Sequence, residues 1–164
     1  MVTNKWIFGT EDFSDAMAVR REVFCKEQGV AECNEEDSYD PLSLHLIIYD
    51  GEKPIATGRV YHNGKVWRIG RCCVLKEERK QGIGDLLMKM LLLKVFEYNP
   101  SEVTISAQEY AQAFYERYGF ERTGDVFLEE GLPHVPMRIS KETMRIPTGC
   151  GKTKTFYDFF EEKQ

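Results

Sequence analysis

The chain has 164 residues, of which 42% are hydrophobic and 30% charged, a composition typical of a globular protein long enough to bury one core. Its 22 basic and 27 acidic residues give a net charge of -5, which excludes a general attraction to nucleic acid or to acidic membranes. The N-terminus lacks the basic start and apolar stretch of a signal peptide, and no run reaches the roughly 18 apolar residues that a membrane-spanning helix needs. We therefore expect a cytoplasmic protein with neither a nucleic-acid nor a membrane partner.

The chain has five cysteines, an odd number, and no two of them form a C-x-x-C pair. They are Cys25, Cys33, Cys72, Cys73 and Cys150. This pattern favours reduced thiols over disulfides, and it predicts no metal site.

The N-terminal quarter of the chain predicts a helix followed by a loop. Residues 10–29 have a helical pattern, with Thr10 as the N-cap, acids in the first turn and Gly29 at the end. Residues 30–41 are rich in acids and end at a proline, so they predict a loop. We expect the acidic part of this loop, residues 35–40, to be solvated, although it would favour a cationic ligand if it lined a cleft.

Runs of β-forming residues alternate with turn residues before position 76. The turns at residues 51–53 and 63–64 separate three such runs, and Asn-Gly between two of them is a strong hairpin signal. We expect three successive strands to form an antiparallel meander, with a further short strand near the N-terminus. The predicted strands are residues 5–9, 43–50, 54–63 and 65–75.

The second half of the chain predicts alternating helices and strands. Residues 83–99 are apolar almost all round, which indicates a buried helix, and a proline follows it. Residues 103–108 predict a strand, and residues 109–120 have an apolar stripe at helical spacing. Residues 125–140 predict two β segments that a Gly/Pro turn separates.

The order of these elements predicts the connectivity and the domains. A strand–helix–strand crossover makes the strands at 65–75 and 103–108 parallel. We expect residues 1–140 to form one domain and residues 141–164 a C-terminal extension. Helical spacing of its phenylalanines predicts a docking helix that packs on the body or on a second chain, so a homodimer is one open alternative. These residues are Phe156, Phe159 and Phe160.

Two glycines, Gly82 and Gly84, stand where the 83–99 helix begins, after Arg79 and Lys80. A glycine inside a helix costs about 0.5–1 kcal/mol relative to alanine, so their place needs a reason. A helix N-terminus presents backbone N–H groups and a partial positive charge, and glycines let an anion approach them. The loop is therefore a candidate anion cradle. A plain loop–helix junction is the alternative, which the spacing alone leaves open.

Two other nucleotide motifs fit the sequence poorly. A phosphate loop at residues 147–153 would need a glycine at the position of Ile146, and only 11 residues follow. A dinucleotide fingerprint that starts at Gly82 and Gly84 would need its third glycine at the position of Leu87.

The sequence R-K-Q-G-I-G from Arg79 to Gly84 resembles the acetyl-coenzyme A (acetyl-CoA) motif R/Q-x-x-G-x-G/A of the GCN5-related N-acetyltransferases, the GNAT superfamily. The segment AQEYAQAFYERYGFERTGD, residues 107–125, resembles a strand and short helix that recur in this superfamily. The resemblance covers about residues 3–140. It implies an α+β fold (α/β/α) with a mixed, mostly antiparallel sheet, a splayed parallel pair and flanking helices.

Two further segments resemble the ElaA-type subfamily. RREVFCKEQGV, residues 20–30, is similar to its opening pattern R-x-x-VF-x-x-EQ. EEGLPHVPM, residues 129–137, is similar to its pattern EDGIPH-x-x-M, although Glu130 stands where that pattern has Asp.

The resemblance implies acetyl-CoA as cosubstrate and assigns residues to its binding. Backbone groups of Cys73 and Val74 should bond the pantetheine arm, so their roles are main-chain only. Gln108 stands at a strand end where many relatives carry an asparagine that contacts the cofactor. Main-chain amides should hold the pyrophosphate, and they belong to Arg79, Lys80, Gln81, Gly82, Ile83, Gly84 and Asp85.

The implied reaction is direct attack of an amine on the thioester. A tyrosine keeps its proton at neutral pH and can give it to the departing thiolate. Tyr115 matches the superfamily's usual tyrosine acid, and the alternative is that it belongs with Phe114 to the apolar stripe. A hydrogen-bond donor must stabilise the oxyanion.

Three residues are candidates for the base that deprotonates the amine. Glu27 lies near the end of the first predicted helix, and a solvated charge is its alternative role. His45 lies in an apolar strand, where a core histidine is the more common case. His134 lies between Pro133 and Pro136, which keep the segment extended, so it could order water or bind the acceptor. Relay through water would need no single base.

The sequence thus predicts an acyl-CoA-dependent N-acetyltransferase with an unidentified primary amine as acceptor, either a small molecule or a peptide. The alternative is a non-catalytic CoA-binding sensor or interaction module.

Overall fold

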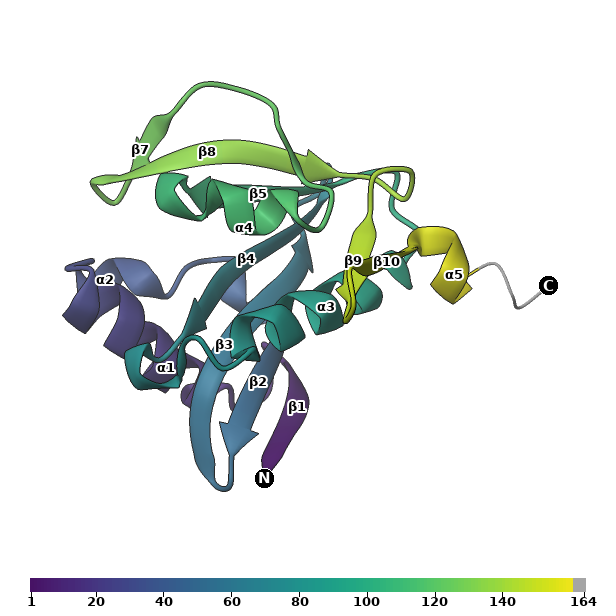
Figure 1. Ribbon diagram of the computed structural model, residues 1–164. Coiled ribbons are helices and arrows are strands. Elements are labelled where there is room, and N and C mark those ends of the chain that lie inside the picture. The colour runs from purple at the N-terminus through teal and green to yellow at the C-terminus, as the bar shows by residue number, and fades with distance from the viewer. Residues whose placement is uncertain (161–164) are drawn as a thin grey trace. The chain divides into compact units, whose positions relative to one another are not determined.

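The computed structural model describes residues 1–160, and the chain divides into two compact units, Met1–Glu97 and Tyr98–Gln164 (Figure 1). The division falls inside the first predicted domain, and the boundary at residue 140 stays a prediction. Within the described residues, no helix is both long and apolar enough to cross a membrane.

An antiparallel four-stranded sheet forms the frame of the first unit. Its strands follow chain order, as the predicted meander requires, and β1 starts earlier than the sequence indicated. Runs of mostly buried β-forming residues and the turn at Asn63-Gly64, where Gly64 has a φ of 93°, account for this arrangement. The strands are β1 (Val2–Phe8), β2 (Leu44–Asp50), β3 (Lys53–His62) and β4 (Trp67–Val74).

The first helical segment starts later than predicted and changes its type. Thr10 is not its N-cap, because the side chain of Asp12 accepts a hydrogen bond from the N–H of Ser14 (2.9 Å) and the helix begins there. α1 spans Ser14–Arg20 and continues as a π-helix over Arg21–Glu27. The N–H of Gln28 still donates to a carbonyl five residues earlier, and Gly29 ends the segment with a φ of 79°.

Residues 30–42 are more ordered than the predicted loop. They contain the short helix α2 (Glu32–Glu35) and a 3-10 turn at Asp40–Leu42.

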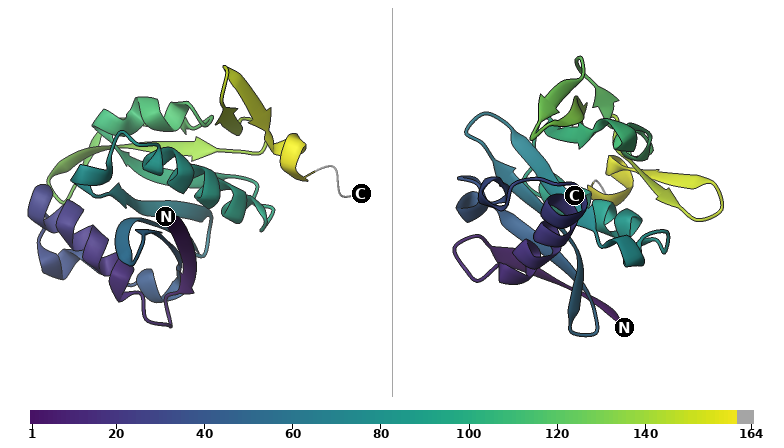
Figure 2. Two further views of the ribbon diagram at one scale, coloured as in Figure 1. Left: turned by 60° about the horizontal axis from the view of Figure 1, so that its bottom comes forward. Right: turned by 90° about the vertical axis from the view of Figure 1, so that its left-hand side faces the viewer.

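Helices α1 and α3 (Ile83–Phe96) cover opposite faces of the sheet in the first unit (Figures 1 and 2). Gly58 of β3 faces α3, because a Cβ on it would lie 2.7 Å from Leu91 Cδ1 and 3.3 Å from Cys72 Sγ. The apolar α3 predicted from residues 83–99 therefore packs directly on the backbone of β3. On the other face, Ala16 of α1 packs with Ile47 and Tyr49 of β2.

A β-bulge interrupts β4 in front of the predicted cofactor residues. Thr57 pairs with Cys73 and Arg59 with Gly70, so that Gly58 faces two residues instead of one. Arg71 at the bulge has a φ of 50°, an uncommon value for a residue other than glycine. The bulge therefore redirects β4 two residues before Cys73.

The second unit contains β5 (Val103–Gln108) and β8 (Leu132–Ile139), which are antiparallel, with β6 (Glu121–Arg122) and β7 (Phe127–Glu129) on the other edge of β8. The sequence did not indicate β6. The predicted 109–120 helix is a 3-10 turn, Glu109–Ala111, followed by α4 (Gln112–Glu116). Gly119 follows with a φ of 95°, and a Cβ there would overlap the Thr143 carbonyl at 1.8 Å.

The C-terminal segment forms a hairpin and a short helix. β9 (Arg145–Thr148) pairs with β10 (Lys152–Thr155), and α5 (Phe156–Phe160) contains the predicted helical phenylalanines. Phe156 stacks on Phe160 at 4.7 Å between ring centroids. The hairpin, which the sequence analysis missed, places residues 147–153 in strands and a turn, unlike a phosphate loop.

Candidate active site

The glycine loop connects β4 to α3 within the first unit. β4 ends at Val74, a 3-10 turn spans Lys76–Glu78, and α3 begins at Ile83. Gly82 is the N-cap residue and has a φ of 82°, which costs a residue with a Cβ roughly 1–2 kcal/mol. A Cβ at Gly82 would meet nothing within 4 Å. Glycine therefore sets the backbone conformation here and leaves open space in front of the helix.

The amides at the start of α3 suit a pyrophosphate. The N–H of Leu86 donates to the Gly82 carbonyl over 3.0 Å as the first hydrogen bond of the helix, so the amides before it lie outside the helical ladder. Among the described residues, no side chain caps this end of α3. Arg79 and Lys80 lie in the same loop and add positive charge. The amides outside the helical ladder and the two basic residues of the loop fit the phosphate groups of a CoA ester.

Arg79 forms a bidentate ion pair with Glu27 at the end of the π-helix. Its Nη1 and Nη2 atoms each lie 2.8 Å from a Glu27 carboxylate oxygen, and its Nε donates to the Val74 carbonyl over 3.0 Å. These hydrogen bonds lower the pKa of Glu27 from its ordinary value. The structure thus brings two predicted site residues together, and the pairing makes Glu27 a weaker base.

The thiol of Cys73 is buried, and burial raises its pKa well above the ordinary value. Cys72 is half-buried, and its Sγ lies 3.6 Å from the Gly70 carbonyl oxygen. A buried thiol that keeps its proton is a poor nucleophile, so the arrangement agrees with a main-chain role for Cys73. In the part of the chain that the structure describes, no disulfide joins Cys25, Cys72, Cys73 or Cys150.

An arginine–carboxylate cluster ties residues 35–40 to the first unit. Its members are Arg20, Arg59, Arg71, Glu35, Asp37 and Asp40. The Oδ1 atom of Asp40 accepts hydrogen bonds from Nη1 of Arg20 and from Nη1 of Arg59, both at 2.7 Å. Arg20 Nε binds Glu35 at 2.8 Å. The expected solvated loop is therefore wrong for Glu35 and Asp40, which are 3% and 0% exposed.

The cluster cancels its own charge, because it pairs three arginines with three carboxylates. Burial alone would raise the pKa of Asp40, but the hydrogen bonds and charges of Arg20 and Arg59 hold it well below the ordinary value. Three of the four acids in residues 35–40 are therefore neutralised by arginines, and the exposed Glu36 lies outside the cluster. Arg71, the bulge residue with positive φ, bonds Glu35 at 3.1 Å and Asp37 at 3.2 Å, so the cluster also holds the bulge of β4.

His45 is a core residue, in agreement with the second of its two predicted roles. It is 1% exposed, its Nε2 atom lies 3.1 Å from the Asp40 carbonyl oxygen, and Phe13 stacks on its ring at 4.5 Å. Burial lowers its pKa, so it stays neutral at physiological pH.

Two predicted site residues of the second unit lie opposite each other. Gln108, the last residue of β5, pairs with His134 of β8, and Phe127 of β7 pairs with His134 from the other side. His134 is mostly buried, its Nδ1–H donates to the Leu132 carbonyl over 2.8 Å, and its Nε2 lies 3.4 Å from Glu129 Oε2.

Tyr115 lies near the end of α4 in the second unit, half-buried. Its ring makes edge contacts with Phe114 at 5.3 Å and with Phe120 at 5.7 Å. Both of its predicted roles, acid and part of an apolar cluster, are compatible with this position.

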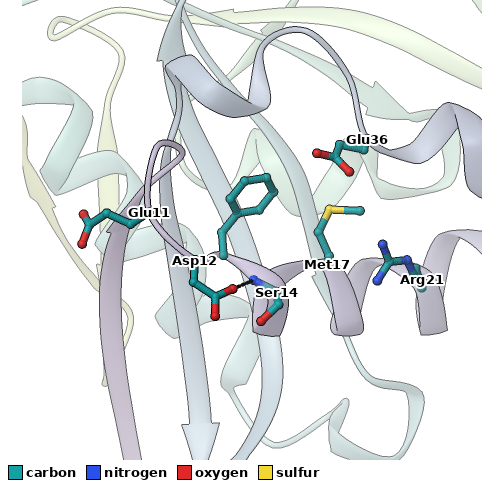
Figure 3. A pocket seen from close by; sticks show the side chains of 7 residues that line it. Glu11, Asp12, Ser14, Met17, Arg21 and Glu36 are labelled. Atoms are coloured by element: carbon teal, nitrogen blue, oxygen red, sulfur yellow. Dashed lines mark hydrogen bonds between the residues drawn. The ribbon is translucent and has the colours of Figure 1, made fainter.

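A pocket of about 250 Å³ opens at the start of α1, away from the glycine loop, with Met17 on its apolar side and Arg21 and Glu36 at its edge (Figure 3). Asp12, which also lines it, is engaged with the backbone of Ser14. The pocket contains none of the predicted site residues. In the described side chains, no group of three His, Cys, Asp or Glu residues could hold a metal ion.

Comparison with known proteins identifies the family. A family model described as the acetyltransferase (GNAT) domain matches residues 10–141. YjcF of Bacillus subtilis, which bears the name of an uncharacterized N-acetyltransferase, is 38% identical over 128 residues, or 77% of this chain and 91% of the relative. A crystal structure of an acyl-CoA N-acyltransferase from Pseudomonas aeruginosa superposes with a TM-score of 0.75 at 26% identity, over 84% of this chain and 99% of that one. Escherichia coli ElaA superposes equally well, with a TM-score of 0.75, 25% identity and the same coverage.

The chain therefore belongs to the GNAT acetyltransferase family, and the resemblance to the ElaA-type subfamily is confirmed. The predicted fold class, a mixed, mostly antiparallel α+β sheet with a parallel pair and flanking helices, is confirmed by the same likeness. The protein is an enzyme of the acyl-CoA-dependent N-acyltransferase class.

The sequence analysis missed the arginines of the cluster and Glu129. The local sequence does not mark Arg59 or Arg71, and Arg20 appears only as the first residue of the ElaA-type pattern. The partners of these arginines lie 15 to 36 positions away. Glu129 could have been found from the hairpin register, because Glu130-Gly131 suits a two-residue turn.

Proposed function

We propose that this enzyme transfers an acetyl group from acetyl-CoA to a primary amine by direct attack of the amine on the thioester. The single observation that carries the proposal is the glycine loop at the start of α3. There, Gly82 leaves open space in front of helix amides that lie outside the helical ladder.

The cofactor residues follow from this loop. Main-chain groups of Cys73 and Val74, at the end of β4 beyond the bulge, bind the pantetheine arm, and Gln108 adds a side-chain contact. The pyrophosphate lies against the amides from Arg79 to Asp85. The family's acyl-CoA chemistry supports this assignment, and acetyl is the acyl group that the motif resemblance favours.

Tyr115 donates a proton to the departing thiolate, which is chemistry that a phenol can do at neutral pH. The base is His134 or Glu27, acting directly or through water. Of the two, Glu27 is the weaker candidate because Arg79 already binds both of its oxygens.

The acceptor is a small-molecule amine or the amine of a peptide, such as a lysine or an N-terminus. Since arginines neutralise Glu35, Asp37 and Asp40, only a small part of the negative charge in residues 35–40 is left to select a cationic acceptor. A cytoplasmic location and a homodimer formed through the C-terminal segment remain proposals. Light scattering of the full chain tests the homodimer.

A pair of glycine variants tests cofactor binding. Gly82→Ala and Gly64→Ala both place a Cβ on a residue with positive φ and open surroundings, so each should lose roughly 1–2 kcal/mol of stability. Only Gly82→Ala should also weaken acetyl-CoA binding in calorimetry, by tenfold or more, because its Cβ occupies the space in front of α3. Equal acetyl-CoA affinity in both variants would contradict the proposal.

Thiol release from acetyl-CoA in the presence of an amine library tests turnover. We expect release with at least one class of amine. Binding of acetyl-CoA without release by any amine would favour the alternative, a CoA-binding sensor or interaction module.

A further inference from the structure

The β7–β8 hairpin places Glu129 next to His134. Glu130 and Gly131 form its two-residue turn, and both have positive φ values, 51° and 72°, as a type I′ turn requires. With this turn, Glu129 pairs with Leu132 and Phe127 pairs with His134. Glu129 and His134 are therefore diagonal neighbours on one face of the hairpin.

The hydrogen bonds of His134 define where it can accept a proton. Because Nδ1 lies 2.8 Å from the carbonyl oxygen of Leu132, Nδ1 carries a hydrogen. The lone pair of the neutral ring is then on Nε2, which lies 3.4 Å from Glu129 Oε2. A lone pair and a carboxylate oxygen repel each other at this distance, unless a proton or a cation lies between them. A positive charge on or near His134 would therefore be stabilised by the Glu129 carboxylate.

The surroundings leave this pair accessible from one side. The side chain of His134 is 9% exposed, whereas that of Glu129 is 46% exposed. On β5 the facing residue is the neutral Gln108, and on β7 His134 is flanked by Phe127, whose ring lies 5.8 Å away, and by the acidic Glu129. The imidazole is covered, and its carboxylate neighbour reaches solvent.

We propose that His134 is the base for the acceptor amine and that Glu129 is its positioning residue, a statement that rests on the function proposed above. The acceptor ammonium donates an N–H to Nε2 of His134. The proton moves to Nε2, and the electron pair of the broken N–H bond stays on the amine nitrogen, which then attacks the thioester. Glu129 stabilises the imidazolium that forms.

The other two base candidates are less suited to this step. Glu27 has both oxygens engaged by Arg79, and His45 is enclosed in the core. Of the two histidines, His134 has the partly exposed carboxylate of Glu129 near its Nε2 atom, whereas the carboxylate near His45, that of Asp40, is buried.

Glu129→Gln tests the proposal, with Glu121→Gln as the matched control because it removes one negative charge from β6, on the same edge of β8. We expect Glu129→Gln to lower kcat/KM for the amine about tenfold, with acetyl-CoA affinity unchanged. Glu129→Asp, which keeps the carboxylate, should restore the rate toward the wild-type value, and Glu121→Gln should resemble the wild type.

An unchanged kcat/KM in Glu129→Gln or in His134→Ala, or a failure of Glu129→Asp to restore the rate, would overturn the inference. Thermal unfolding of each variant separates a folding defect from a loss of rate. If the wild type fails to bind acetyl-CoA or to turn over any amine, the proposed function itself is wrong. If it turns over and the Glu129 variants behave as the wild type, only the role of Glu129 and His134 is refuted.

Discussion

Replacing Asp40 by asparagine removes one negative charge from the centre of the arginine–carboxylate cluster. In the native protein the Asp40 carboxylate receives hydrogen bonds from Arg20, from Arg59 and from the backbone of Asp37, at 2.7 to 3.1 Å. Both arginines are almost completely buried. The substituted side chain would present a neutral amide to them, and a buried positive charge would lose its partner.

Removal of one partner from a buried ion pair typically costs about 3–5 kcal/mol. With a urea m-value of about 2 kcal/mol/M, the midpoint of unfolding should fall by roughly 2 M. Asp50→Asn is the control, because its pair with the N-terminal ammonium (3.1 Å) is 55% exposed on the Asp50 side and should contribute less than about 1 kcal/mol. Urea unfolding followed by circular dichroism measures both. Equal losses in the two variants would refute the reasoning.

The same substitution predicts a pH dependence. Since the folded-state pKa of Asp40 lies well below its unfolded value of about 3.9, Asp40 contributes stability above that unfolded pKa, and the contribution is lost as pH falls through the folded pKa. The stability difference between wild type and Asp40→Asn should therefore be constant from about pH 5 to 8 and should shrink below about pH 4. A difference that grows in acid would contradict the assigned direction.

Two further substitutions concern the reaction. Tyr115→Phe should slow thiol release at least about 100-fold if the phenol is the acid, with acetyl-CoA affinity unchanged; a rate equal to wild type would leave Tyr115 in the apolar cluster. Glu27→Gln should tighten acetyl-CoA binding a few-fold in calorimetry, because Arg79 is then available to phosphate. Weaker binding would show instead that Glu27 orients Arg79 for the cofactor.

Local sequence patterns were sufficient for most of the strands and for α3. The meander follows from runs of β-forming residues and from Asn63-Gly64, and α3 follows from the apolar segment 83–99. The start of α1 was wrong because the side chain of Asp12 forms a turn with the N–H of Ser14 and the helix starts only after it, with Phe13 as its N-cap residue. Helix propensity does not decide between this start and Thr10. The β9–β10 hairpin lacks a strong β pattern, so only the fold reveals it.

The candidate site also has one part that the sequence predicts and another that only the structure shows. The glycine loop depends on contiguous residues, so the motif was visible in the sequence. The pairing of Arg79 with Glu27 joins residues 52 positions apart, and the contact between Glu129 and His134 depends on the register of a hairpin. Such contacts arise from tertiary structure, which composition and spacing do not encode.

The π-helix from Arg21 to Glu27 has a consequence for how this family member tolerates deletions. Each residue of an α-helix turns about 100° around the axis, and wider turns advance less, so removing one residue from this segment would let it rewind as an α-helix. The carboxylate that now meets Arg79 would keep nearly the same direction around the cylinder, because a π-helical stretch corresponds to an α-helix with one residue inserted. A single codon lost here would therefore preserve the pairing of Glu27 with Arg79, whereas mutating Glu27 itself removes it.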